Sequence, residues 1–296
     1  MKAKDFVDLV VLAAVWGASF LFMRLGAPDF GPIALVQLRL MIAAVFLLPI
    51  LYIRVGLNEL GPDWQKLTLL GFLNSAIPFL LLTYSTLFVT AGFSSVINAT
   101  APLWGALIAW LWLSEKLRPI GVAGVFLGFV GVAILAGDKD SLAVPGSTLA
   151  VGAAVGGAFF YGIGANYAKR YTKHLNSLSV ATGSMLYPAL LMTPFAIWYW
   201  PESQPSVTAW VAIIAMGIAS TGLAYILYFR LIANVGPARA ITVAYLIPVF
   251  AVFWGALIIG EQVTPLMIVG CLIIFVGTAL VTGMIPGKRY GKTSGG

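Results

Sequence analysis

Two glutamates, Glu115 and Glu261, stand at matching places in the chain, each thirteen residues after a proline and at the end of an apolar stretch. Such carboxylates could act as gates that exchange partners between two conformations. They could also anchor a helix end at a membrane interface, which is the interpretation favoured by the sequence alone. Because the helix dipole disfavours a carboxylate at a C-terminus, we expect a cationic partner for Glu115, such as Lys116 or Arg118.

Charged side chains are almost absent from the middle of the apolar stretches. No Asp or Glu lies near the centre of one, and Arg39 is the only basic residue inside one. An acid that exchanges a proton for a cationic substrate would need such a central position, so this kind of coupling is not expected. Arg39 could bind a substrate carboxylate, extend outward to water, or fix helix packing, and we favour packing.

Residue types that commonly catalyse reactions or bind metals are scarce. Cys271 is the only cysteine, and His174, in a basic loop, is the only histidine. A disulfide framework, a cysteine-based metal site and a histidine cluster are therefore excluded. The chain also has no Walker motif, no dinucleotide-binding fingerprint and no HExxH motif. We expect no catalytic residue, no metal and no cofactor, and an enzyme is not predicted.

Aromatic and uncharged polar residues are the best candidates for a binding site. Any single aromatic residue is more often a helix contact or a lipid-facing side chain, whereas a polar group at this depth must face the interior. Aromatic rings with a few hydrogen-bonding groups are the usual wall of a small-molecule pocket, and a ring can also attract a cation. We predict a central substrate site lined by Trp16, Phe79, Thr83, Asn98, Thr100, Tyr161, Tyr225 and Tyr245.

The elements that must position these residues are membrane-spanning helices. Hydrophobic residues make up 60% of the chain and charged residues only 9%, against roughly 25% charged in soluble proteins. A span needs about 20 apolar residues, and backbone groups in lipid must be satisfied within the helix. Polar and Pro/Gly clusters divide the chain into ten such segments, near 8–24, 32–53, 66–88, 93–113, 119–136, 147–168, 177–200, 208–230, 238–259 and 265–285.

The chain contains the same apolar unit twice. Glu115 and Glu261 are 146 positions apart, and glycines follow each glutamate at the same spacings of nine and sixteen residues. Each copy holds five spans, an odd number, so the second copy must enter the membrane from the opposite side. We therefore expect an all-α membrane protein of two inverted five-helix repeats, residues 1–140 and 141–286, followed by a flexible tail at 287–296.

The basic residues predict an orientation. With the N-terminus in the cytoplasm, 14 of the 17 Lys and Arg residues lie on the cytoplasmic side; only Arg24 and Lys139 fall outside, and Arg39 lies within a span. This asymmetry follows the positive-inside rule and predicts cytoplasmic termini with the 137–146 loop outside. It also explains the net charge of +7 through contact with anionic lipid, so nucleic acid is not expected as a partner.

The repeated unit also carries a family signature. Pro102-Leu-Trp, Leu113-Ser-Glu115-Lys, Gly124 and Gly131, with their second copies around Pro248 and Glu261, resemble the repeat of the EamA family in the drug/metabolite transporter superfamily. The resemblance covers residues 8–285. It implies ten helices, cytoplasmic termini and export of small metabolites. The aromatic-rich interior, poor in carboxylates, is similar to bacterial amino-acid exporters of the YddG type.

Together these features predict a monomeric exporter in the bacterial inner membrane. Its expected substrates are small metabolites, above all amino acids including aromatic ones, moved by alternating access through a central cavity. One alternative is a proton-coupled antiporter of drugs or other metabolites. An alternative of another class is a membrane enzyme or a lipid-handling protein, which would need a reactive cluster that the chain does not offer.

Overall fold

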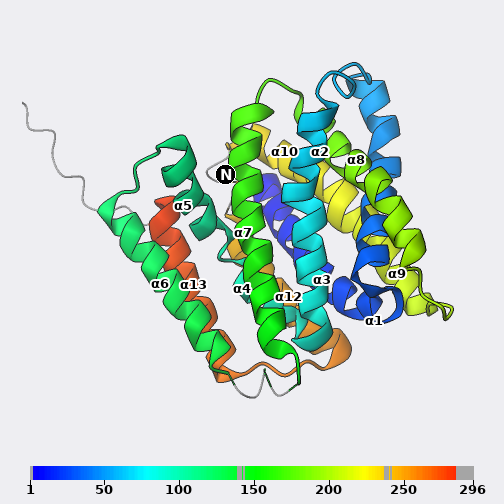
Figure 1. Ribbon diagram of the computed structural model, residues 1–296. Coiled ribbons are helices and arrows are strands. Elements are labelled where there is room, and N and C mark those ends of the chain that lie inside the picture. Colours follow the sequence, from blue (N-terminus) through cyan, green and yellow to red (C-terminus); the bar gives the residue numbers. More distant parts are fainter. Residues whose placement is uncertain (1–2, 139–141, 143, 237–239, 241, 285–296) are drawn as a thin grey trace, which may run out of the picture.

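The computed structural model describes residues 3–138, 142, 144–236, 240 and 242–284, and the regular elements within these residues are all helices (Figure 1). Some residues of the predicted outer loop and the whole predicted tail lie outside this description. The first half contains α1 (Ala3–Arg54), α2 (Trp64–Gly71), η1 (Phe72–Ala76), α3 (Ile77–Phe88), α4 (Ala91–Asn98), α5 (Ala101–Leu113) and α6 (Pro119–Ala136). The second contains α7 (Ser147–Tyr171), α8 (Ser177–Trp198), α9 (Val207–Ala215), η2 (Met216–Leu223), α10 (Ala224–Val235), α12 (Val243–Ile259) and α13 (Pro265–Thr282).

These elements combine into ten spans. The 52 residues of α1 would extend about 78 Å as one straight helix, far beyond a bilayer, but the chain breaks at Gly31, where φ is 68°. The glycine permits this backbone, and α1 therefore supplies two spans. The segments α2–η1–α3, α4–α5 and α9–η2–α10 each form one interrupted span. The predicted all-α architecture of ten spans is confirmed.

The two halves repeat each other in backbone detail. The π-helical segments η1 and η2 interrupt the third and the eighth span, which are counterparts in the two repeats. Such widened turns often lie at functional sites, because they change the direction in which the following side chains point. Each of the two segments contains a polar residue of the central cavity described below, Asn74 in η1 and Ser220 in η2.

A crossing of small residues joins the last helix of each half. The helices α6 and α13 run side by side at one edge of the molecule (Figure 1). A Cβ atom built on Gly124 would lie 2.6 Å from the Gly277 carbonyl oxygen, and one on Gly131 would lie 3.0 Å from that of Gly270. The offset of 146 exchanges these two pairs, so the crossing lies on the pseudo-two-fold axis. These four glycines therefore allow the close approach of two helix backbones that small residues commonly give in membrane proteins.

Candidate functional site

A cavity of about 570 Å³ lies between the two halves. This volume lies within the range typical of small-molecule sites. Its wall combines residues of α1, the third and fourth spans, α7, the eighth span, α12 and α13. Both repeats contribute, as expected for a site at a repeat interface.

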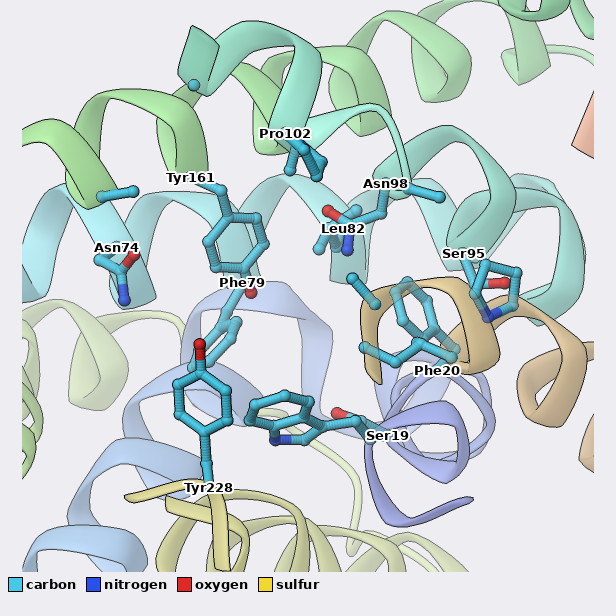
Figure 2. Close-up of a pocket in the computed structure, with 18 of the residues that line it drawn as sticks. Ser19, Phe20, Asn74, Phe79, Leu82, Ser95, Asn98, Pro102, Tyr161 and Tyr228 are labelled. Carbon is cyan, nitrogen blue, oxygen red and sulfur yellow. The ribbon is translucent and has the colours of Figure 1, made fainter. Parts of the chain in front are cut away.

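Five of the eight predicted site residues line this cavity: Trp16, Phe79, Asn98, Tyr161 and Tyr225. Their rings form much of the wall. The centre of the Trp16 ring lies 5.3 Å from the centre of the Tyr228 ring, and the centres of the Phe79 and Tyr161 rings are 6.4 Å apart. Tyr161 and Tyr228 reach into the cavity from opposite sides, from α7 and α10 (Figure 2). The cavity therefore has aromatic surfaces on facing walls.

The other three predicted residues are not part of the wall. Thr83 is fully buried on α3. The Thr100 hydroxyl donates to the Ile97 carbonyl at 2.7 Å, and the Tyr245 hydroxyl lies 2.9 Å from the Thr282 hydroxyl, which does line the cavity. Their proposed contact with substrate stays a prediction.

Sequence reasoning left several polar wall residues out of the site. Asn74 in η1 and Ser220 in η2 both line the cavity and are related by the 146-residue offset. That repeat symmetry was the signal that could have identified them. Two further wall groups, the Asn98 amide oxygen and the Ser19 hydroxyl, are buried and have no hydrogen-bond partner among the described residues. Unpaired polar groups of this kind are available to a bound molecule.

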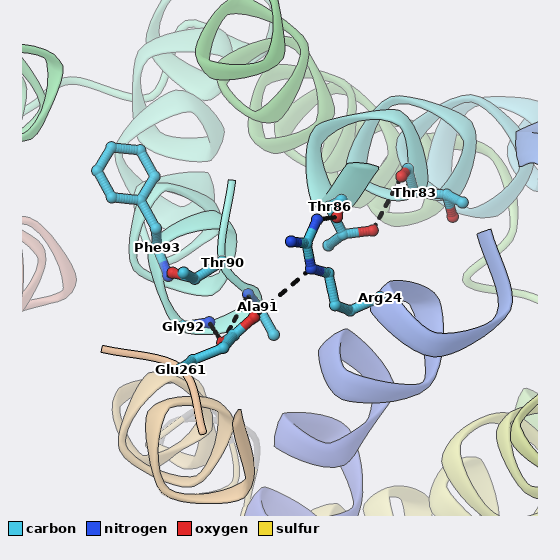
Figure 3. Close-up of polar contacts among 8 residues, drawn as sticks. All are labelled: Arg24, Thr83, Thr86, Thr90, Ala91, Gly92, Phe93 and Glu261. Atoms are coloured by element: carbon cyan, nitrogen blue, oxygen red, sulfur yellow. Dashed lines mark hydrogen bonds and ion pairs between the residues drawn. The ribbon is translucent and has the colours of Figure 1, made fainter. Parts of the chain in front are cut away.

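On one side of the molecule, Glu261 holds the loop after α12 against α4. Its carboxylate accepts hydrogen bonds from the Ala91 N–H, at 2.9 and 3.0 Å, and from the Gly92 N–H at 3.5 Å (Figure 3). It thereby caps the N-terminus of α4, where the helix dipole favours an anion. The Arg24 Nε lies 3.8 Å from the same carboxylate, and the Arg24 guanidinium donates to the Thr86 carbonyl.

Burial raises the pKa of the Glu261 carboxyl above its usual value, and the N–H groups and Arg24 oppose this shift. The loop that carries Glu261 is thus held against α1, α3 and α4. We call this side of the molecule the Glu261 end.

The opposite side, the Glu115 end, is open. The carboxylate of Glu115 forms an ion pair with Lys169, and the two side chains are 50% and 59% exposed. Lys169 also lines the cavity, so the cavity reaches the surface here. The expected partners, Lys116 and Arg118, were wrong, because the chain turns after α5 and brings Glu115 toward α7.

The two glutamates are built alike. Glu115 follows Ser114 (φ 56°), and Glu261 follows Gly260 (φ 67°), each a left-handed residue that ends its helix. The backbone N–H groups of both glutamates bond to helix carbonyls at 3.1 Å, on residues that are again 146 positions apart. Their cationic partners, Arg24 and Lys169, are 145 positions apart. The same arrangement, a left-handed residue followed by a glutamate that faces a cation, therefore occurs twice. It is buried at one end of the molecule and exposed at the other.

Comparisons with known proteins agree with this architecture. The model of the EamA-like transporter family matches residues 7–137 and 148–283. The uncharacterized transporter YoaV of Bacillus subtilis is 26% identical over 286 residues, covering 94% of this chain and 97% of its own length. The uncharacterized inner membrane transporter YedA of Escherichia coli K12 is also 26% identical, covering 94% of this chain and 90% of its own.

A solved crystal structure shares the fold, with a TM-score of 0.66 at 20% identity, over 96% of this chain and 98% of that one. The family matches fall on the two halves of the chain in turn, in keeping with the repeated architecture. This protein belongs to the EamA-like transporter family and is a multi-pass membrane transporter.

Proposed function

We propose that this transporter exports amino acids, including aromatic ones, by alternating access through the central cavity. The observation that carries the proposal is a cavity between the repeats whose wall includes the exposed Lys169 at the Glu115 end, while at the Glu261 end a buried glutamate is bound to α4. Its aromatic rings suit apolar side chains, and its few polar groups suit a backbone-like head group.

Repeat symmetry supplies the second conformation. In it, Glu115 takes the buried role and contacts the chain near Gly236, the counterpart of Thr90. Lys169 then takes the place of Arg24, and Glu261 becomes exposed. Since Glu115 and Glu261 share their backbone geometry, the two states can be close in energy, as a transporter requires.

The direction follows from the basic residues. We place the Glu115 end in the cytoplasm, because most Lys and Arg residues of the connecting loops lie on that side. The open cavity then faces the cytoplasm, and substrate is released outside. If an impermeant thiol reagent labels Lys173→Cys but not Gln262→Cys in intact cells, the proposed orientation is wrong.

We do not expect proton exchange to drive the cycle. Among the described residues, no Asp or Glu lines the cavity. The competing proton-coupled antiporter would need such a group. Among the described residues, no cluster of His, Cys, Asp and Glu is arranged to bind a metal. The cavity is complete within one chain, which is compatible with a monomer.

Purified protein in liposomes tests the proposal. We expect uptake of labelled aromatic and aliphatic amino acids down their gradients, with no accumulation when a pH gradient is imposed. The variants Tyr161→Ala and Asn98→Ala should transport more slowly, whereas Trp200→Ala, which is exposed outside the cavity, should match the wild type. Proton-driven accumulation, or wild-type rates in both cavity variants, would contradict the proposal.

A further inference from the structure

The second arm of α1 carries a buried cation that faces the cavity. Arg39 is only 4% exposed and lines the cavity wall. It does not extend outward to water, which removes one of the three roles considered from the sequence. A charge at this depth is expensive unless something compensates it, and such residues commonly mark a substrate site.

The contacts of Arg39 within the protein are neutral. Its Nε donates to the Thr221 hydroxyl at 3.0 Å, and its guanidinium carbon lies 3.6 Å from the centre of the Phe79 ring. A guanidinium has five N–H donors, and the Thr221 contact uses one. Within the described part of the chain, no carboxylate forms an ion pair with Arg39.

Other arginines in the bundle differ in this respect. Arg24 lies beside the Glu261 carboxylate, and Arg230 forms an ion pair with Asp8, although both arginine side chains are more exposed than Arg39. Of these three arginines, the most deeply buried one is thus the one without an acid. This arrangement is unfavourable for a purely structural charge, because breaking or omitting a partner of a buried ion is strongly destabilising.

We propose that Arg39 is the anchor for the carboxylate of the substrate. This inference rests on the proposed transport function and specifies its substrate class. Stacking on Phe79 and the bond to Thr221 hold the guanidinium plane, which leaves its remaining N–H groups for a planar, two-oxygen acceptor. The contact supplies the negative charge that the protein itself does not provide.

The rest of the wall favours a carboxylate over a phosphate. A phosphate carries about two charges and commonly needs several cations, whereas the other basic wall residue, Lys169, is already paired with Glu115. The unpaired Asn98 amide oxygen can accept a hydrogen bond from an ammonium group. The substrate class is therefore a zwitterion with one carboxylate and an apolar or aromatic side chain.

Matched ligands test the anchor without any mutation. Binding of phenylalanine and leucine to the purified transporter is measured by calorimetry, against their amides and against the amines that lack the carboxyl group. The acids should bind roughly 10- to 100-fold more tightly than the amides, as expected for a charge-assisted contact in a partly dry site. Equal affinity of acids and amides, or no binding by either acid, would overturn the proposal.

Two variants then assign the preference to this side chain. Arg39→Gln should abolish the difference between acid and amide, while Arg39→Lys should retain part of it. Arg54→Gln, an exposed arginine in the last turn of the same helix, is the matched control and should keep the full preference. An undiminished preference in a folded Arg39→Gln protein would overturn the anchor.

A failure of the Arg39 anchor can be distinguished from a failure of the proposed amino-acid export. If the amides are transported at the same rate as the acids, export through the cavity is supported and the Arg39 anchor is contradicted. If acids bind tightly and through Arg39 but are not transported, the anchor is supported and export is contradicted. If Arg39→Gln does not fold, the comparison of ligands on the wild type decides alone.

Discussion

The Glu261 end and the Glu115 end each place a glutamate beside a cation, but in different environments. At the first, a carboxylate with a 10% exposed side chain accepts backbone hydrogen bonds from α4 and faces Arg24. At the second, a half-exposed carboxylate holds only a lysine. A charge-assisted cap in a partly buried place contributes about 1–2 kcal/mol, whereas an exposed ion pair contributes about 0–1 kcal/mol. The difference teaches that conformation, not local sequence, decides which glutamate is buried.

The largest expected effect comes from breaking the axis that relates the two ends. Gly277→Ala places a methyl group 2.6 Å from the Gly124 carbonyl oxygen, so α6 and α13 must separate. We expect a loss of about 1–3 kcal/mol of stability, measured as a lower melting temperature in detergent. Gly152→Ala is the control, since nothing lies within 4 Å of its added carbon. It should leave the melting temperature unchanged or slightly raised, and an equal fall in both variants would contradict the packing account.

Removing the carboxylate of Glu261 should have the next largest effect. Glu261→Ala deletes the group that accepts from the Ala91 N–H and faces Arg24. We expect the Glu261 end to open more often and net transport to change by about tenfold, in line with the loss of one charge-assisted contact. Glu115→Ala is the matched control, because its carboxylate is exposed in this conformation. Equal accessibility of a Ser95→Cys thiol in both variants, measured from the Glu261 side, would argue against the gate.

Acidity at the Glu261 end should favour the closed state. Burial raises the pKa of Glu261 when this end is closed, so the closed state binds a proton more readily than a state in which the carboxylate lies in water. The stabilisation is present at low pH and is lost as the pH rises through the raised pKa. Lowering the pH on that side from about 7 to about 5 should slow transport by less than about tenfold. The Glu261→Gln protein should lose this dependence, and faster transport in acid would contradict the sign.

The smallest effect is expected at the exposed pair. Lys169→Gln removes the cation that faces Glu115, in a contact that water screens. Melting temperature should fall by no more than that expected for about 0–1 kcal/mol. The transport rate should fall by a larger factor than this small loss of stability would explain, since Lys169 is proposed to act when the Glu115 end closes. A stability loss comparable to that of Gly277→Ala would show that the two ends are more alike than the structure indicates.

Much of the fold could be predicted because lipid imposes one solution on long apolar segments. The ten spans followed from segment length, and the break at Gly31 falls between two predicted spans. The π-helical segments could not be predicted, because nothing local in Phe72–Ala76 distinguishes them from an ordinary helix. They depend on packing between spans, and they are what bring Asn74 and Ser220 to the cavity.

For the cavity wall, the sequence indicated how deep each residue lies in the membrane but not which way its side chain faces. Position along a span gives the level of a residue in the membrane, so Trp16 and Tyr161 were placed correctly in the wall. Thr83 has a suitable depth, yet its helix turns it into the protein interior, and a single sequence does not fix that angle. For Arg39 the sequence favoured helix packing, and only the structure shows that no described carboxylate forms an ion pair with it.

Paired distance measurements test the exchange of the two ends most directly. Spin labels are placed at Leu87 and Gln262 across the Glu261 end, and at their repeat counterparts, Ala233 and Lys116, across the Glu115 end, with Cys271 replaced. On addition of a transported amino acid, the Leu87–Gln262 distance should gain a longer population while the Lys116–Ala233 distance gains a shorter one. If either distance stays fixed while the labelled protein transports at the wild-type rate, the two glutamates do not alternate as gates.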